Sequence, residues 1–298
     1  MRVFVTGATG FIGSAIVQEL IAAGHQVLGL ARSDPAAASL AAAGAEVHRG
    51  SLDDVASLRS GAAAVDGVIH TAFIHDFSKY QANCETDRHA IEALGSALAG
   101  SERPLIVTSG TALLTPGRLG TEEDAPASSS SSFPRVASEE AAASVAARGV
   151  CVSVLRLPPS VHGDGDHGFV PALIGIAREK RVSAYVGDGL NRWPAVHRLD
   201  AAHLFRLALE KGSAGARFHG VADEGVPVRD IADVIGRRLN VPVVTKSAEE
   251  AADHFGWLAH FLSIDNPTSS TLTRERLGWR PAQAALIPDL DRARYFQT

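Results

Sequence analysis

The chain has 298 residues, 46% of them apolar and 20% charged, a composition typical of a globular protein with a substantial core. Its formal net charge of -5 and pI near 6.2 argue against a nucleic-acid surface, because phosphate recognition needs clustered positive charge. We expect neither a secretory signal nor a membrane span, because no apolar run of about 18 residues occurs. Cys84 and Cys151 are too few for a disulfide framework or a four-cysteine metal site, so we expect a reduced, cytoplasmic protein without a metal.

Short apolar runs alternate with helical patterns through the first half of the chain, which is typical of a parallel sheet covered by helices. The expected strands are Arg2–Thr6, His25–Ala31, Glu46–Arg49, Gly67–Ala72, Pro104–Ser109 and Cys151–Leu157. The expected helices are Phe11–Ala23, Pro35–Ala43, Gln81–Ala99 and Ser138–Arg148. Gly24, Gly44 and Gly149 directly follow the first, second and fourth, and glycine there favours helix termination. The pattern predicts an α/β fold with a doubly wound parallel sheet and a ligand across the carboxyl ends of its strands.

The second half of the chain is less regular. Leu114–Pro134 is rich in Gly, Pro and Ser and predicts a long loop, either a lid or a disordered segment. After Pro158 we expect a helix near Phe169–Lys180, a short strand at Val182–Val186 and several further helices. We therefore expect residues 1–157 to form the sheet domain, and residues 158–298 to form a smaller substrate-side lobe interleaved with the sheet.

A glycine-rich segment, TGATGFIG, lies between the first strand and the first helix. Gly7 permits a tight turn, Gly10 lets the backbone approach a pyrophosphate, and Gly13 lets the helix pack close to the strand. The phosphates would then meet unpaired N–H groups at the positive end of the helix. The expected phosphate-binding residues are Gly7, Thr9, Gly10, Phe11, Ile12 and Gly13.

The spacing G-x-x-G-x-x-G resembles the short-chain dehydrogenase/reductase superfamily, especially its extended and atypical branches, which are similar to NAD-dependent epimerases and dehydratases. The resemblance covers nearly the whole chain and implies a Rossmann fold. It implies an adenine contact at Leu52 and Asp53 in GSLDD, adenosine and nicotinamide ribose contacts at Thr71, Ala72 and Phe73, and a carboxamide contact at Pro158 and Pro159. The segments Gly187–His197 and Leu277–Pro281 resemble the C-terminal lobe of the extended branch.

The end of the second strand bears on the choice of nicotinamide cofactor. NAD-preferring sites usually have an acidic residue about 20 residues beyond the glycine loop. Here the strand ends with Arg32 and Ser33, and a permanent cation with a hydroxyl suits a 2′-phosphate. Asp34 precedes Pro35 and is typical of a helix start. The pattern favours NADP(H), with a solvated arginine at a strand end as the alternative.

The usual chemistry of the superfamily needs a Tyr-x-x-x-Lys pair, and this sequence has none. By the resemblance, Arg135 falls at the tyrosine position and Glu139 at the lysine position. Arg135 is a candidate for stabilising an oxyanion, or alternatively a surface residue that is salt-bridged to Glu139. The other candidate catalytic residues are Ser109 and Thr111, hydroxyls that close the fifth strand, and His162.

Three further residues are candidates for the substrate pocket. His75 is a second possible proton relay, and Phe169 and Trp193, with Phe73, would form an apolar wall. Aromatic residues in such positions are also commonly plain core. The alternative to a catalytic role for the hydroxyls of Ser109 and Thr111 is that they cap the end of a strand.

Three functions fit these observations. The first is an NADP(H)-dependent oxidoreductase that transfers hydride to a small, largely apolar carbonyl or imine compound without the usual tyrosine. An activated substrate suits this site, because a protonated imine needs little acid catalysis. The second is a non-catalytic NADP(H)-sensing regulatory protein, and the third is a sugar-nucleotide epimerase or dehydratase, whose chemistry depends on the missing tyrosine. We expect a small-molecule partner and neither nucleic acid nor membrane, and a homodimer stays open.

Overall fold

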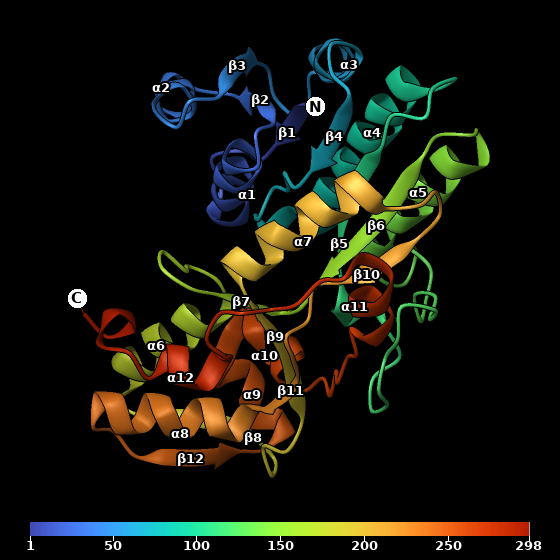
Figure 1. Ribbon diagram of the computed structural model, residues 1–298. Helices are drawn as coiled ribbons and strands as arrows, with labels where there is room; N and C mark the ends of the chain where they lie inside the picture. Colours follow the sequence, from blue (N-terminus) through green and yellow to red (C-terminus); the bar gives the residue numbers. More distant parts are fainter. Residues whose placement is uncertain (298) are drawn as a thin grey trace.

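The computed structural model describes residues 1–297, with Phe77 described by its backbone alone. A seven-stranded parallel sheet forms the larger part of the molecule, in the order β10-β6-β5-β4-β1-β2-β3 (Figure 1). Its strands are β1 (Arg2–Thr6), β2 (Gln26–Ala31), β3 (Glu46–Arg49), β4 (Gly67–His70), β5 (Leu105–Gly110), β6 (Val152–Leu157) and β10 (Arg217–His219). The order reverses between β1 and β4, so the predicted doubly wound α/β fold is confirmed.

Helices cover both faces of the sheet, because side chains alternate along each buried strand. On β1, Val3 and Val5 face one core, whereas Phe4 faces the other. The first core is covered by α1 (Phe11–Ala22), α2 (Asp34–Ala42) and α7 (Arg198–Lys211). The second core is covered by α3 (Val55–Ala63), α4 (Tyr80–Leu98) and α5 (Ala137–Ala147). The sequence pattern placed α1, α2, α4 and α5 within one residue at each end but did not predict α3, although Asp54 caps its N-terminus by accepting a hydrogen bond from Ser57 N at 2.9 Å.

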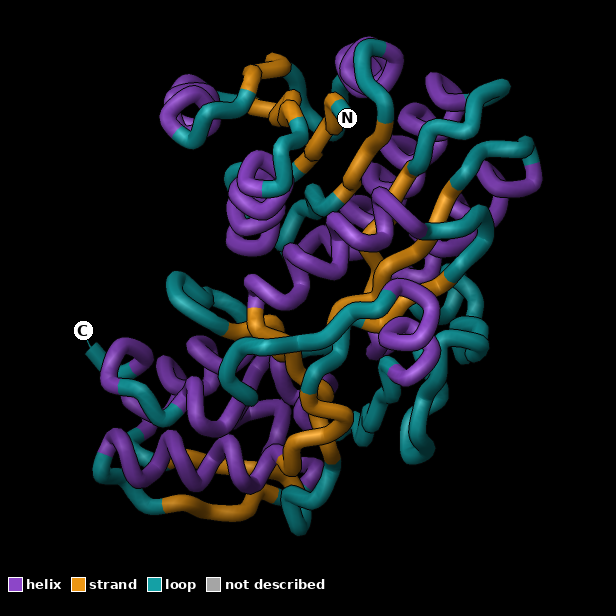
Figure 2. The backbone as a smooth tube through the Cα atoms, viewed as in Figure 1, coloured by secondary structure: helices purple, strands orange, loops and turns teal. Residues whose placement is uncertain are grey.

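The C-terminal half builds a second body below the main sheet (Figures 1 and 2). It has a three-stranded sheet of β7 (Ser160–His162), β9 (Arg192–His197) and β11 (Asp223–Pro227), and a parallel pair of β8 (Ser183–Val186) and β12 (Val243–Lys246). Its helices are α6 (Phe169–Lys180), α8 (Val228–Leu239), α9 (Ala248–Phe255), α10 (Ala259–Leu262), α11 (Thr271–Leu277) and α12 (Leu286–Leu290). The two halves interleave, since α7 and β10 return to the main sheet. Within residues 1–297, no helix is long and apolar enough to cross a membrane.

The stretch between Leu114 and Phe133 is a long loop, as expected, but it is anchored to the rest of the chain (Figure 2). Gly117 N donates to Asp265 O and Gly120 N to Pro267 O, both at 2.8 Å. Glu122 accepts hydrogen bonds from the backbone and hydroxyl of Thr273 at 2.7 and 2.6 Å. The loop therefore forms part of the contact between the main sheet and residues 265–273.

Candidate functional site

The glycine loop has the shape that a pyrophosphate needs. Gly7 has φ +68°, and a side chain there would meet Ala72 N at 2.7 Å. A Cβ at Gly13 would lie 2.0 Å from Gly7 O, so only glycine lets α1 pack this close to β1. The N-cap residue, Gly10, provides no side-chain cap, and the first turn of α1 has no acidic residue. The amides at this helix start, flanked by Thr9, Phe11 and Ile12, therefore fit a bound anion.

The end of β2 presents positive charge. Arg32 is exposed, and its guanidinium has no carboxylate partner within residues 1–297. Ser33 caps α2 by accepting a hydrogen bond from Ala36 N at 3.3 Å. Asp34 is the first residue of α2, as expected, and its carboxylate is ion-paired with Arg49 at 2.6 Å. The acid nearest to Arg32 in the sequence is thus partly neutralised by a second arginine.

The remaining expected cofactor contacts lie at the carboxyl ends of neighbouring strands. Thr71 donates its hydroxyl to Thr6 O at 2.7 Å, which ties the segment after β4 to the end of β1. Leu52 and Asp53 follow β3, and the Asp53 side chain is exposed. Pro158 and Pro159 connect β6 to β7. This arrangement places Leu52, Asp53, Thr71, Ala72, Phe73, Pro158 and Pro159 on the edge of the sheet where ligands of doubly wound folds bind.

Arg135 lies in the short 3-10 helix Pro134–Val136, directly before α5, and points into the sheet domain. Its Nη1 lies 2.7 Å from Asp87 Oδ2 and also contacts Ser138 Oγ, while Nη2 donates to Thr108 O at 3.1 Å. Its guanidinium stacks over the ring of Phe73 at 4.3 Å. The alternative of a surface ion pair between Arg135 and Glu139 is therefore wrong, because Arg135 pairs with Asp87 on α4. This ion pair fixes the guanidinium beside Phe73, a residue of the expected cofactor segment.

A buried hydrogen-bond chain leads from this arginine to the glycine loop. His70 lies 3.0 Å from Asp87 Oδ1 through Nε2 and 2.8 Å from Thr6 Oγ1 through Nδ1. Thr6 Oγ1 also accepts a hydrogen bond from Ala72 N at 3.3 Å. Burial alone would raise the pKa of Asp87, but the charge of Arg135 and hydrogen bonds from His70 and Ser138 hold that pKa well below its usual range. Asp87 is therefore ionised at neutral pH, and it links the end of β1 to Arg135.

Asp87, His70 and Ser138 were not among the residues predicted for the site. His70 directly precedes Thr71, and Ser138 stands three residues after Arg135, so both adjoin residues that the sequence analysis did select. Asp87 had no comparable signal except that it is a carboxylate on the apolar face of a helix.

Ser109 belongs to a different buried cluster. Its hydroxyl donates to Glu139 Oε1 at 2.7 Å, and the Glu139 carboxylate receives two hydrogen bonds from Arg156, at 2.8 and 2.7 Å. Arg156 is fully buried and Glu139 is 8% exposed. The residue at the lysine position thus forms a structural ion pair that occupies the Ser109 hydroxyl.

The other two candidate catalytic residues are also held by structural partners. Thr111 donates to Asn266 Oδ1 at 2.8 Å, and its carbonyl accepts from Asn266 Nδ2 at 3.0 Å. His162 lies 2.9 Å from Asp289 through Nδ1, and both side chains are fully buried. Burial lowers the pKa of His162, and the neighbouring Asp289 only partly opposes this effect. Ser109, Thr111, Arg135 and His162 therefore belong to four separate side-chain networks.

The residues expected to line the substrate pocket divide into two groups. Phe169 packs against Trp193, with ring centroids 5.8 Å apart, and also against Trp257 and Phe261. Trp193 is buried and donates through Nε1 to Phe261 O at 3.1 Å. Both residues belong to the core of the lobe. Trp257, by contrast, is exposed at the surface of this aromatic cluster.

His75 lies instead near the arginine of the sheet domain. Its ring is 5.3 Å from that of Phe73, and burial together with the charges of Arg135 and His167 lowers its pKa. Tyr80 reaches the same place from the start of α4, with its ring 6.3 Å from Phe73. Burial raises the pKa of Tyr80 to about 12. Of these two residues, His75 was predicted from the sequence for the substrate pocket and Tyr80 was not.

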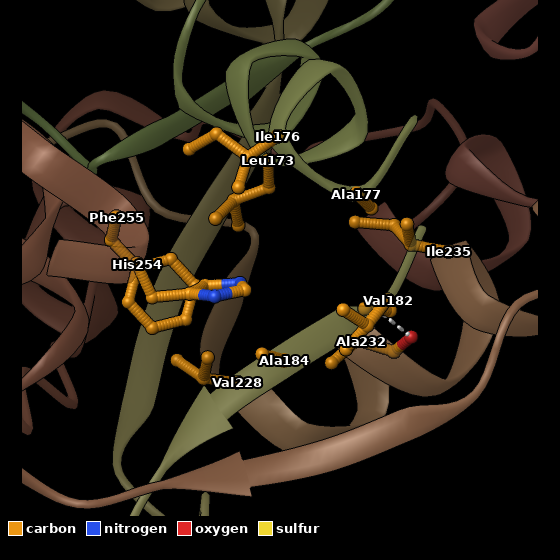
Figure 3. Close-up of a pocket in the computed structure, with 11 residues that line it drawn as sticks. Leu173, Ile176, Ala177, Val182, Ala184, Val228, Ala232, Ile235, His254 and Phe255 are labelled. Carbon is orange, nitrogen blue, oxygen red and sulfur yellow. Dashed lines mark hydrogen bonds between the residues drawn. The ribbon is translucent and has the colours of Figure 1, made fainter. Parts of the chain in front are cut away.

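Two cavities lie away from the glycine loop. The one in Figure 3 is enclosed by α6, α8, α9 and β8 within the lobe, is lined mainly by apolar residues such as Leu173 and Ile235, and has room for about one water molecule. The other cavity, of about 470 Å³, lies between α5, the loop residues Pro126, Ser128 and Ser129, and the sheet edge at β6 and β10. Neither contains a residue of the expected cofactor site.

Comparisons with known proteins agree with this geometry. Residues 3–220 match the NAD dependent epimerase/dehydratase family. An uncharacterized protein of Schizosaccharomyces pombe is 56% identical over 99% of this chain and 100% of its own length. A 2-alkyl-3-oxoalkanoate reductase of Stenotrophomonas maltophilia is 29% identical over 83% of this chain and 78% of its own length.

The fold also matches solved structures. The structure of a dTDP-glucose 4,6-dehydratase from Streptomyces venezuelae, with NAD and TYD bound, covers 99% of this chain and 97% of its own, with 21% identity and a TM-score of 0.78. That likeness shows the Rossmann fold, and the match over residues 3–220 shows the family. The chain belongs to the NAD dependent epimerase/dehydratase family.

Proposed function

We propose that the protein is an NADP(H)-dependent reductase of small, largely apolar carbonyl or imine compounds that are already activated toward reduction. The observation that carries this proposal is the position of Arg135. Its guanidinium is fixed by Asp87 at 2.7 Å and stacked 4.3 Å above Phe73, at the position where the family pattern has tyrosine. A cation fixed there would polarise a carbonyl oxygen without donating a proton.

Three features support a preference for NADP(H). Arg32 is exposed without a carboxylate partner at the end of β2, and the Ser33 hydroxyl is beside it. The carboxylate of Asp34, which would repel a 2′-phosphate, is paired with Arg49 at 2.6 Å. A guanidinium binds phosphate through charge-assisted hydrogen bonds, so the balance at this strand end favours the phosphorylated cofactor.

The neighbourhood of Arg135 explains why an activated substrate is required. The pKa of His75 lies below its ordinary value, so the imidazole is neutral at pH 7, and the pKa of Tyr80 is about 12, so the phenol keeps its proton. Neither side chain is a good proton donor at neutral pH. When bound, reduced nicotinamide supplies a hydride to the carbonyl or imine carbon. A proton from water completes the alcohol, whereas a protonated imine brings its own.

The comparisons favour a ketone as the activated substrate. The relative from Stenotrophomonas maltophilia is described as a 2-alkyl-3-oxoalkanoate reductase, a name that places the reducible keto group β to a carboxylate. The aromatic cluster of Phe169, Trp257 and Phe261 supports an apolar substrate on the lobe side. Epimerase or dehydratase chemistry is disfavoured because it depends on the tyrosine that Arg135 replaces.

The proposal is tested by following NADPH oxidation with a panel of 3-oxoalkanoates, their esters, cyclic imines and unactivated ketones. We expect turnover with the activated compounds, slower turnover with NADH, and little with unactivated ketones. Tight NADPH binding without turnover across the panel would contradict the proposal and would favour a cofactor-sensing role.

A further inference from the structure

Arg198, in the C-terminal half of the chain, contacts the start of α1. Its guanidinium carbon lies 4.9 Å from the centre of the Phe11 ring, and Phe11 is the first residue of α1. Its Nη2 lies 3.5 Å from Ser14 Oγ, in the same first turn. A cation from the first residue of α7 therefore lies against the helix start that follows the glycine loop.

This helix start offers amides to an anion, and Arg198 retains unused donor capacity. Gly10 gives no side-chain cap to α1, and the first turn has no acidic residue that would take the place of an anion. Nη1 and Nη2 of Arg198 each carry two N–H bonds, and within residues 1–297 each has one hydrogen-bond acceptor. One N–H of each terminal nitrogen is therefore left to donate to a further acceptor.

The segment Gly163–Gly168, between β7 and α6, holds Arg198 in this position. Asp164 O accepts a hydrogen bond from Arg198 Nη1 at 2.6 Å. A Cβ at Gly163, where φ is +131°, would lie 3.0 Å from Arg198 Cγ, so only glycine permits this approach. The loop also reaches α1 directly, because the His167 ring lies 5.6 Å from that of Phe11. In Figure 1 the loop before α6 projects toward α1.

The C-terminal residues fix the same segment from its other side. The carboxylate of Asp164 is paired with Arg294, and Gly163 N donates to Tyr295 Oη at 2.9 Å. The carboxylate of Asp164, whose carbonyl holds Arg198, is therefore already paired with another arginine. Arg198 itself forms no ion pair within residues 1–297, so its charge is available for a ligand.

From these contacts we propose that Arg198 binds the pyrophosphate of the dinucleotide and thereby joins the C-terminal lobe to the cofactor. Phosphate oxygens at the start of α1 would accept from the terminal N–H groups of Arg198 and from the helix amides. The inference rests on the dinucleotide site of the family and not on the preference for NADP(H), because both cofactors contain the pyrophosphate.

The chain offers a matched control on the same helix. Arg206 also joins α7 to α1, through Glu19 at 2.7 Å, but it lies two turns farther along α7. Arg206→Ala therefore removes a tie of the same kind without removing charge from the helix start. Arg198→Lys keeps the charge but loses the planar group, and Arg32→Ala removes the charge expected to bind the 2′-phosphate.

The experiment measures the dissociation constants of NADPH and NADH by nicotinamide fluorescence for these variants at two salt concentrations. We expect Arg198→Ala to weaken both cofactors by about 10- to 100-fold and to reduce the salt dependence of binding, with Arg198→Lys intermediate. Arg206→Ala should leave both constants within about threefold. Arg32→Ala should weaken NADPH alone.

Two results would overturn the inference: unchanged binding by Arg198→Ala, or equal weakening by Arg198→Ala and Arg206→Ala. Thermal unfolding without ligand reports whether Arg198→Ala folds. If it does not, Arg198→Lys decides, and unchanged affinity for both cofactors would then contradict a contact between the guanidinium and the pyrophosphate. If Arg32→Ala has no selective effect, the proposed NADP(H) preference fails while the Arg198 result still stands.

Discussion

Glu139 and Arg156 form a buried, two-pronged ion pair, with Arg156 Nε 2.8 Å from Oε1 and Nη2 2.7 Å from Oε2 of the glutamate. By the sequence resemblance, Glu139 falls at the position where the family pattern has a lysine, and its Oε1 also accepts a hydrogen bond from the Ser109 hydroxyl. A lysine cannot be restored here without bringing two positive charges together in the core. The departure from the pattern is therefore built into the packing between α5 and β6.

This pair predicts a large cost for Glu139→Lys. The substitution leaves the fully buried Arg156 without its counterion and adds a second cation, so we expect a loss of at least about 3–5 kcal/mol in the free energy of unfolding. Glu140→Gln is the control, because the neighbouring Glu140 pairs with Arg88 at a partly exposed site and should cost about 1 kcal/mol. Urea unfolding measures both, and a similar stability for the two variants would be inconsistent with this packing.

Arg135 is expected to act on the rate rather than on cofactor binding. Arg135→Ala should lower kcat by about 100-fold with an activated ketone, as does the loss of one oxyanion donor in other enzymes, while the NADPH dissociation constant changes little. Arg88→Ala is the control, since Arg88 is similarly buried but pairs with Glu85 and Glu140 on the outer side of α4. Steady-state kinetics measures kcat for Arg135→Ala and Arg88→Ala. Equal kcat values for the two variants would contradict the role of Arg135.

Asp87 predicts a pH-dependent contribution to stability. Asp87→Asn should reduce the free energy of unfolding by about 2–3 kcal/mol at pH 7, because Arg135 and His70 lose their carboxylate partner. The folded pKa of Asp87 is lowered, so its contribution is complete above the unfolded value of about 4 and declines as pH falls below it.

The difference in stability between wild type and Asp87→Asn should therefore be constant from about pH 7 to pH 5 and shrink below about pH 4. Urea unfolding across this range measures it. Glu85→Gln, an exposed carboxylate on the same helix, should show little difference at any pH. If the difference in stability between wild type and Asp87→Asn persisted undiminished to pH 2.5, the charge of the Asp87 carboxylate would not be the source of the stabilisation.

The pH profile of turnover distinguishes between proton sources. With an activated ketone, we expect kcat to vary little between about pH 7 and pH 9, because His75 titrates below its ordinary pKa and Tyr80 titrates near 12. With a cyclic imine, the rate should fall as pH rises past the pKa of the imine. An inflection near neutral pH that disappears in His75→Ala would instead identify a side-chain acid.

The local part of this account could be predicted from the sequence. The glycine loop, the main strands and helix α6 follow from residue patterns that act over a few positions, and α6 begins and ends at the predicted residues. Helix α3 was missed because its sequence, VASLRSGAA, carries only a short apolar pattern, although Asp54 supplies a capping signal.

The partners of the candidate catalytic residues could not be predicted in the same way. Asp87 is 48 residues from Arg135, and Asn266 is 155 residues from Thr111. Such pairs depend on which helix faces lie against the sheet, and no local pattern encodes them. The sequence therefore located the strand ends that build the site but not the networks that hold its side chains.

The most direct test of the central claim is NADPH oxidation by the purified protein with a 2-alkyl-3-oxoalkanoate ester, alongside Arg135→Ala and Arg88→Ala. Our account predicts turnover by the wild type and by Arg88→Ala, about 100-fold slower turnover by Arg135→Ala, and weaker activity with NADH. Saturable NADPH binding without oxidation of the cofactor by the wild-type protein, with this ester and the rest of the panel, would contradict it.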